Sequence, residues 1–327
     1  MAFLQSPYHI GSHGRMFDWV YRGSIRGFSS GGANHHDAWC GGCGTGIWYF
    51  FRNIWSHEFA NDGNAVNTNG DLVPAGGYHS ISGYSSETHS FVAGGRNSGN
   101  SADVNVIQSF PNVNPAAGAT DLADLTSADA SFTPVSGLTH GYCNGGRTGT
   151  HTTMEKFAFV NTTNATLVGN LANTHATSSG GGATDSANDY GYVAGGTNSG
   201  TDAIDRFSFA NESNSDDVGN LATGSGQAAG CSAETHGYFL GPGNPTRVQK
   251  YAFASSGNAT QVSTLSSSGT GRGEGMSSMT HGYVTGGEVH HTQIDKFSFA
   301  NETTWNDVGD LGSGQTTNRC HHASSHF

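Results

Sequence analysis

A short pattern, in which an aromatic residue is followed by two glycines, recurs along this chain and limits the fold more than any other feature. The clearest copy is THGYVTGG at 280–287; similar copies occupy 235–242, 189–196, 139–146 and 88–95, and a shorter version, DAWCGG, lies at 37–42. The central aromatic residues are spaced 45 to 52 residues apart and are Trp39, Phe91, Tyr142, Tyr192, Tyr238 and Tyr283. Repeats of this length are typical of propeller blades or solenoid turns.

Three other segments accompany each copy and predict four strands per unit. After the glycines comes a segment such as IDKFSFAN at 294–301, where Phe297 and Phe299 alternate with polar residues as in a half-buried strand. A segment ending in Leu follows, such as DVGDL at 307–311, and a run of small residues precedes each aromatic strand after the first. Blades converge on a central channel, so we expect the small-residue strand to be innermost and Phe297 and Phe299 to lie between blades.

The end of the chain predicts how the ring closes. The first unit has no small-residue run before Trp39, whereas the chain ends in HHASSHF, whose residues Ala323–His326 resemble such a run. We therefore expect this segment to supply the inner strand of the blade that contains Trp39–Gly42, because closure removes exposed sheet edges. The sequence predicts an all-β, six-bladed propeller, with seven blades as the alternative if residues 5–25 form a further partial blade.

The order of these segments resembles the Kelch repeat. In that family a hydrophobic strand ends in Gly-Gly and is followed by a strand with aromatic residues and then by a strand with a tryptophan. Here GYVTGG, IDKFSF and TTWNDVGDL occur in the same order, and Trp305 stands at the position of the Kelch tryptophan. The resemblance covers residues 36 to 327 and implies a Kelch-like β-propeller fold, which by itself does not specify a function.

The first 33 residues match none of the repeats, so we predict an N-terminal extension at 1–33 and a propeller at 34–327. The extension concentrates aromatic residues and arginines, a composition typical of interface hot spots. We predict that it docks on another subunit or protein; the alternative is that it covers a face of its own propeller. The candidate docking residues are Arg15, Phe17, Trp19, Tyr21 and Arg22.

Charge and hydropathy exclude several kinds of partner. The formal net charge is −12, and Lys156, Lys250 and Lys296 are the only lysines, which argues against the large cationic surface that binds nucleic acid. No apolar run approaches the ~20 residues needed to span a membrane. The N-terminus lacks a basic segment followed by an apolar one, so we expect no Sec-type secretion.

Metal binding and catalysis find little support in the sequence. Cys40 and Cys43 form a CxxC pair, which we predict to be packed free thiols because tetrahedral zinc needs two more ligands. Zinc binding and a Cys40–Cys43 disulfide are the alternatives. A histidine recurs at one place in the repeat, and we predict that it makes a hydrogen bond common to the blades; the copies are His89, His140, His236, His281 and His326. Neither a Ser/His/Asp set nor a pair of catalytic carboxylates stands out from the repeats. We therefore predict a protein that is not an enzyme and has no cofactor.

The combination of THGYxxGG, IDKFSFAN and DVGDL is similar to repeat proteins of tailed bacteriophages, especially marine ones. This resemblance implies a virion structural protein associated with the tail or capsid. Its expected partners are other virion proteins or copies of itself, with a host-surface glycan or protein as a further partner in host attachment. The alternatives are a cellular propeller that binds carbohydrate or protein, located outside the cell or at its surface, and an atypical propeller enzyme.

Overall fold

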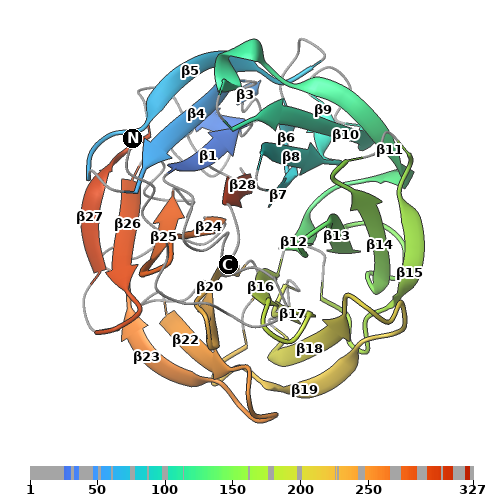
Figure 1. The fold of residues 1–327 in the computed structure, drawn as a ribbon, viewed down its shortest axis with the longest axis vertical. Helices are drawn as coiled ribbons and strands as arrows, with labels where there is room; N and C mark the ends of the chain where they lie inside the picture. Colours follow the sequence, from blue (N-terminus) through green and yellow to red (C-terminus); the bar gives the residue numbers. More distant parts are fainter. Residues whose placement is uncertain are drawn as a thin grey trace, which may run out of the picture.

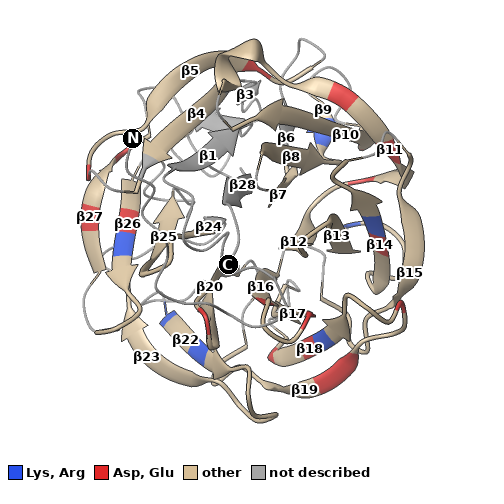
Figure 2. Cartoon of the chain, viewed as in Figure 1, with Lys and Arg blue, Asp and Glu red and all other residues tan. Residues whose placement is uncertain are grey.

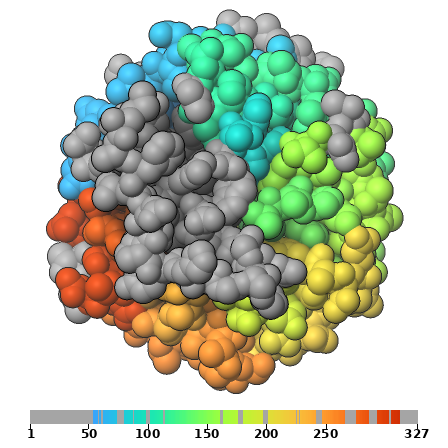
Figure 3. All heavy atoms as spheres, viewed as in Figure 1, coloured from blue at the N-terminus to red at the C-terminus, as the bar shows by residue number. Residues whose placement is uncertain are grey.

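The computed structural model describes most of the chain from residue 26 onward. The described residues are 26–30, 33–36, 47–50, 53–59, 62–73, 78–86, 88–97, 102–112, 114–160, 163–175, 180–196, 201–224, 226, 228–241, 247–265, 274–285, 293–302, 305–311 and 321–324. They form an all-β propeller, in which antiparallel sheets follow one another around a ring (Figure 1). Figure 3 shows the same circular order of the chain on one face of the molecule.

Five blades are each built from one continuous stretch of the described chain, and each is named here by its first strand. The innermost strands are β7 (Ser82–Ser85), β12 (Phe132–Ser136), β16 (Gly181–Asp185), β20 (Ala229–Ser232) and β24 (Glu274–Ser277). The second strands are β8 (His89–Ala93), β13 (His140–Gly145), β17 (Tyr190–Ala194), β21 (His236–Gly241) and β25 (His281–Thr285).

The third and fourth strands complete each blade toward the rim. The third strands are β10 (Val104–Pro111), β14 (Thr153–Ala158), β18 (Ala203–Ser208), β22 (Arg247–Ala252) and β26 (Gln293–Ser298). The outer strands are β11 (Thr120–Asp129), β15 (Thr166–Asn170), β19 (Asp216–Asn220), β23 (Thr260–Thr264) and β27 (Trp305–Asp310). The predicted order, with the small-residue strand innermost, is confirmed in these five blades (Figure 1).

A further four-stranded sheet, the closing sheet, joins the two ends of the described chain. Its order from the centre outward is β28 (His321–Ser324), β1 (Arg26–Ser30), β4 (Asn53–Glu58) and β5 (Val66–Asp71). The C-terminal strand therefore lies in the same sheet as the later strands of the first repeat unit, β4 and β5, but does not pair with them directly. Its partner is β1, with Phe28 opposite Ala323, and not the expected segment Trp39–Gly42, which lies outside the described residues.

The closing sheet includes part of the expected N-terminal extension. Because β1 is hydrogen-bonded to both β28 and β4, residues 26–30 of the expected extension 1–33 belong to the propeller. The alternative of a seventh blade from residues 5–25 concerns a segment outside the described residues, and the described residues form no seventh four-stranded sheet.

The remaining described elements are short. Two two-stranded sheets pair β2 (Ala33–His36) with β3 (Ile47–Phe50) and β6 (Tyr78–His79) with β9 (Arg96–Asn97). A 3-10 turn, η1, spans Pro115–Ala117. Among the described residues no helix has the length and apolar character to cross a membrane.

Stacked aromatic rings join neighbouring blades, as the sequence predicts. The aromatic residue of each second strand stacks on the second phenylalanine of the next third strand, with ring centroids 4.9 Å apart for Tyr142 and Phe209 and 5.1 Å apart for Tyr238 and Phe299. Phe207 and Phe297 also pack against the tyrosine of the preceding blade. The same stack, Tyr283 on Phe59, joins the β24 blade to the closing sheet at 4.5 Å.

Backbone contacts close the ring at its rim and at its centre. At the rim, the amide of Ala65 donates to the carbonyl of Asp310 at 2.8 Å, and Ala165 and Asp124 make the equivalent bond between the β7 and β12 blades. At the centre, a Cβ atom added to Gly230 would lie 2.0 Å from the Gly182 carbonyl oxygen. The inner strands thus approach so closely that only glycine fits at this position, which explains the small-residue runs.

Candidate functional site

The residues predicted to dock a partner cannot be placed against the fold. Arg15, Phe17, Trp19, Tyr21 and Arg22 all lie outside the described residues, so docking through them remains a prediction. Cys40 and Cys43, the alternative zinc ligands, also lie outside them.

Two cysteines, Cys143 and Cys231, lie among the described residues. Cys143 and Cys231 are buried free thiols, and burial raises the pKa of both. Within the described ranges no group of three or more His, Cys, Asp or Glu side chains is arranged to hold a metal ion. The two described thiols are thus parts of the core.

The recurring histidines occupy equivalent places at the start of the second strands. In each described copy a hydrogen bond joins Nδ1 and the hydroxyl of the preceding threonine, as between His281 and Thr280 at 2.8 Å. The copies with this bond are His89, His140, His236 and His281. This shared local bond is the role that the sequence predicts for them; His326 lies outside the described residues.

Burial shifts the titration of three of these histidines. It lowers the pKa of His140, His236 and His281, and the positive charge of a neighbouring lysine lowers each pKa further. The lysines themselves bridge to the next blade, where Lys156 pairs with Glu212 and Lys250 with Glu302. Lys296 pairs with Asp62 at 2.8 Å, across the junction with the closing sheet.

The β16 blade replaces this arrangement with another one. Tyr190 stands where the other blades have histidine, and Arg206 stands where three of them have lysine. The Arg206 guanidinium carbon lies 4.6 Å from the centre of the Tyr190 ring, within the range of a cation–π contact. Since the blade forms without the histidine, the imidazole is not required for the fold of a blade. Figure 2 shows the basic residues along the third strands and acidic ones on outer strands such as β19 and β27.

Each third strand of the five blades also buries one acidic or amide side chain. Glu155, Asp205 and Gln249 each accept a hydrogen bond from a backbone amide of the preceding blade, at 2.8 to 2.9 Å. The donor lies within the outer strand for Glu155 and just after the outer strand for the other two. The full set is Gln108, Glu155, Asp205, Gln249 and Asp295, all at most 3% exposed. Because glutamine and carboxylate alternate at one position, the position requires a hydrogen-bond acceptor and not a charge.

Asp205 has several polar neighbours. Its carboxylate accepts from the backbone and side-chain nitrogens of Asn173 and from the Ser215 hydroxyl, and Oδ2 lies 3.3 Å from Nε2 of the fully buried His175. Burial raises the pKa of Asp205, but the hydrogen bonds from His175 and Asn173 and the charge of His175 outweigh it, so the pKa lies below its ordinary value. The Nδ1 atom of His175 lies 2.9 Å from the Gly195 carbonyl oxygen. The contacts of His175 with Asp205 and Gly195 therefore hold the loop that carries His175, which connects the β12 and β16 blades.

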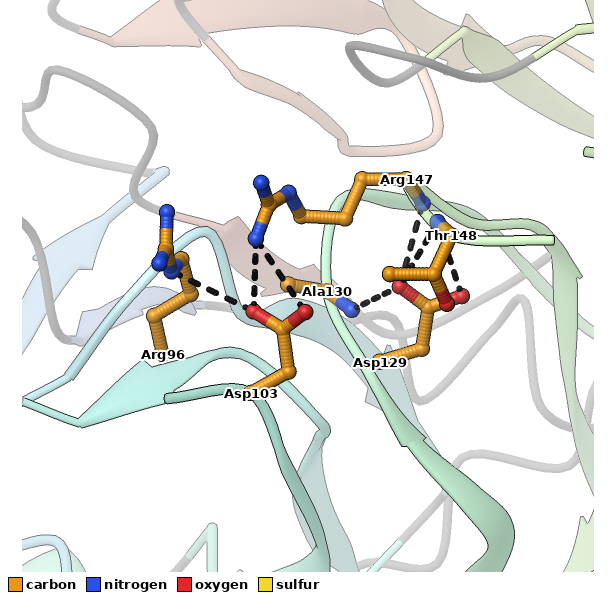
Figure 4. Close-up of polar contacts among 6 residues, drawn as sticks. All are labelled: Arg96, Asp103, Asp129, Ala130, Arg147 and Thr148. Atoms are coloured by element: carbon orange, nitrogen blue, oxygen red, sulfur yellow. Dashed lines mark hydrogen bonds and ion pairs between the residues drawn. The ribbon is translucent and has the colours of Figure 1, made fainter. Parts of the chain in front are cut away.

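One cluster of charged residues does not follow the repeat, and we name it the two-arginine cluster: Arg96, Asp103, Asp129 and Arg147. It lies where the second strands of the β7 and β12 blades turn into the third strands (Figure 4). Nη1 of Arg147 donates to both carboxylate oxygens of Asp103, at 2.9 and 3.1 Å. Nε of Arg96 lies 3.2 Å from the same Oδ1 atom. Two guanidinium groups from adjacent blades therefore meet at one carboxylate.

Asp129 holds the backbone turn that carries Arg147, and in the described contacts it pairs with neither guanidinium group. Its carboxylate accepts the backbone amides of Ala130, Arg147 and Thr148 at 2.7, 3.1 and 3.2 Å. Burial raises the pKa of Asp129 above its ordinary value despite the opposing effect of these bonds. A Cβ atom on Gly146 would lie 2.3 Å from Oδ2 of Asp129, so the turn that carries Arg147 is tightly packed.

The sequence contained a signal for this cluster that pattern reasoning missed. In two consecutive copies of the repeat an arginine directly follows the glycine pair, at Gly94-Gly95-Arg96 and Gly145-Gly146-Arg147. The four glycines have positive φ angles between 63° and 111°, so the chain turns sharply before each arginine. The two arginines therefore leave equivalent turns of neighbouring blades.

Comparison of the sequence with models of known protein families and with curated proteins finds no match. The likeness to Kelch repeats and to bacteriophage proteins therefore rests on the motifs in the sequence, and the fold established by the structure is that of a β-propeller.

Proposed function

We propose that this protein is a non-enzymatic structural propeller. The observation that carries the proposal is the alternation of carboxylate and glutamine at the buried position of the third strands, together with the backbone amides that these side chains accept. Catalytic carboxylates require a particular charge and protonation state, whereas the equivalent position holds a neutral amide in Gln108 and Gln249, each of which accepts a backbone amide. The buried polar groups thus serve the connection between blades.

We further propose a six-bladed, Kelch-like ring in which the closing sheet acts as the sixth blade. Support comes from the junctions, because the closing sheet makes the same aromatic stack and the same rim hydrogen bond to the β24 blade as the other blades make to one another. A ring without a free edge suits a part that must remain folded outside a cell.

The proposed setting is a virion, with the ring attached to a tail or capsid through its N-terminal segment. The resemblance of the repeat to bacteriophage proteins supports this setting, and the aromatic and arginine content of residues 15–22 supports docking there. The partners would be other virion proteins or further copies of the chain, and the exposed faces would serve host attachment.

The test is the presence of the chain in purified particles and its dependence on the N-terminal segment. Removing residues 2–25, which leaves β1 intact, should give a folded ring with unchanged thermal unfolding that no longer enters particles or oligomers. Removing residues 2–10, which spares Arg15 to Arg22, is the matched control and should incorporate normally. Normal incorporation of the longer deletion, or its failure to fold, would contradict docking; absence of the full chain from particles would favour a cellular binding propeller.

A further inference from the structure

The dipeptide Asn-Gly occurs twice in the sequence, at Asn69-Gly70 and at Asn144-Gly145, and the fold places the two copies in different surroundings. This dipeptide is chemically reactive, because the backbone nitrogen of the glycine can attack the side-chain amide carbon of the asparagine. Glycine places no side chain beside that nitrogen, and asparagine is among the thermolabile residues of proteins. The two copies therefore show how the fold changes the reactivity of one dipeptide.

Asn144 is protected by its place in β13. Its side chain is 0% exposed, and Nδ2 donates to the carbonyl oxygens of Thr133 and Tyr142 at 3.0 and 3.2 Å. The carboxamide is thus held by two hydrogen bonds and kept from water. Reaction at this residue requires the blade to open locally first.

Asn69 lies on the outer strand β5, at the rim of the ring, where the pairing with β4 changes register (Figure 1). It is exposed and has a φ angle of 64°. Its backbone amide donates to Oδ1 of Asn67, but among the described residues its side chain has no hydrogen-bond partner. The Gly70 amide donates to Oγ1 of Thr68 at 3.2 Å, which is long for such a bond. The Asn69 carboxamide can therefore rotate and is accessible to water.

From this difference we propose that Asn69 is a site of spontaneous deamidation, with water as the second reactant. The Gly70 nitrogen forms a bond to Cγ of Asn69, the Cγ–Nδ2 bond breaks, and ammonia leaves with the proton of the Gly70 amide. Water then opens the resulting succinimide ring. Attack of water at Cγ breaks the new bond and gives aspartate, whereas attack at the Asn69 backbone carbonyl carbon breaks the original peptide bond and gives isoaspartate. This modification goes beyond the proposed structural function and does not depend on the virion setting.

The isoaspartate product has a consequence for the junction between the closing sheet and the β7 blade. A Cβ atom on Gly70 would lie 1.9 Å from the carbonyl oxygen of Pro115 in η1, and the Asp71 carbonyl accepts the amide of Ala119 at 2.8 Å. Isoaspartate adds one methylene group to the main chain immediately before Gly70. Because the packing leaves no room for this shift, Gly70 and Asp71 cannot both keep their contacts, and the junction is weakened.

The experiment incubates the folded full-length chain at mildly alkaline pH, below its unfolding transition, and maps its peptides by mass spectrometry. The mass increase of one deamidation should accumulate in the Asn69 peptide, as both aspartyl and isoaspartyl forms. It should do so at least about tenfold faster than in the Asn144 peptide, where two hydrogen bonds must open first. In urea, where both dipeptides are unfolded, the two rates should be similar. Asn69→Gly, the matched control, suits the positive φ angle, removes the carboxamide and should abolish the mass increase in its peptide.

Two results would overturn the site: equal rates at Asn69 and Asn144 in the folded protein, or reaction at Asn69 only after unfolding in urea. The effect on the junction has a separate test. The isoaspartyl form, isolated by chromatography, should unfold at a lower urea concentration than freshly purified Asn69→Asp, which carries the new charge without the extra methylene group. Equal unfolding midpoints would show that the junction accommodates the longer main chain and would overturn that part of the proposal.

Discussion

The two ends of the blades differ in how closely they follow the repeat. Where first strands turn into second strands, the same histidine, threonine and tyrosine positions recur, and each histidine makes the same bond to its threonine. Where second strands turn into third strands, Arg96 and Arg147 share Asp103 at a single place. The recurring end is explained by contacts that recur from blade to blade, whereas the other end carries a group of charged residues that joins two adjacent blades.

Equivalent positions in different blades show what a buried polar side chain must provide. Asp205 and Gln249 occupy equivalent positions and accept equivalent backbone amides, so a buried carboxylate is not by itself a sign of chemistry. Equivalent positions in the repeats of one chain can therefore be compared in the same way as a protein and its substituted variants. A position that tolerates both an acid and an amide is defined by its hydrogen bonds.

The largest loss of stability is expected at the glycines of the inner strands, where neighbouring blades approach each other most closely. Gly230→Val should abolish folding, a loss of about 5 kcal/mol or more, because even the first added carbon would lie 2.0 Å from the Gly182 carbonyl oxygen. Gly257→Val is the control, since a Cβ there meets nothing within 4 Å. Chemical denaturation of both variants checks this prediction, and a stable Gly230 variant would show that the centre of the ring is looser than described.

A somewhat smaller loss is expected at the aromatic layer between blades. Phe297→Ala should destabilise the protein by about 3–5 kcal/mol, because the ring is 1% exposed and packs against Tyr238 and Trp305. Phe299→Ala should cost less, since this side chain is only partly buried although it stacks on Tyr238. Urea unfolding of the two variants gives the ranking, and the reverse order would indicate that stacking, and not burial, joins the blades.

Much of the fold could be predicted because the repeat encodes it locally. The first unit was assigned wrongly for a physical reason: the motif RGFSSGG at 26–32 has arginine in place of histidine, and the β2–β3 hairpin is inserted after it. That insertion lengthens the distance from Phe28 to Phe91 to 63 residues, so the regular spacing pointed to Trp39 instead. An insertion in a turn changes the spacing of motifs while leaving the sheet intact.

The two-arginine cluster was harder to predict, because its members meet only in the folded ring. Arg147 and Asp103 are 44 residues apart in sequence and belong to different blades. Spacing within one repeat unit cannot show which positions of adjacent units face each other. The arginines after the glycine pairs were visible, but their common partner follows from the circular arrangement of the blades.

The smallest effect is expected at the recurring histidines, and its dependence on pH gives it a distinctive sign. His281→Gln should cost about 1 kcal/mol or less at pH 7.5, because glutamine can replace the one bond to Thr280. Burial and the charge of Lys296 lower the pKa of His281 in the fold, so the unfolded chain, with a pKa of about 6.5, takes up the proton first as the pH falls. The stability that this histidine contributes is therefore present above about pH 6.5 and is lost as the pH falls toward the lowered pKa of the folded state.

The natural chain should consequently lose more stability than the His281→Gln variant between pH 7.5 and 5.5. The titration of carboxyl groups is common to both proteins and cancels in the difference. Urea unfolding of both proteins at the two pH values measures this difference, and a larger acid loss in the glutamine variant would mean that the imidazole is stabilised in its charged form.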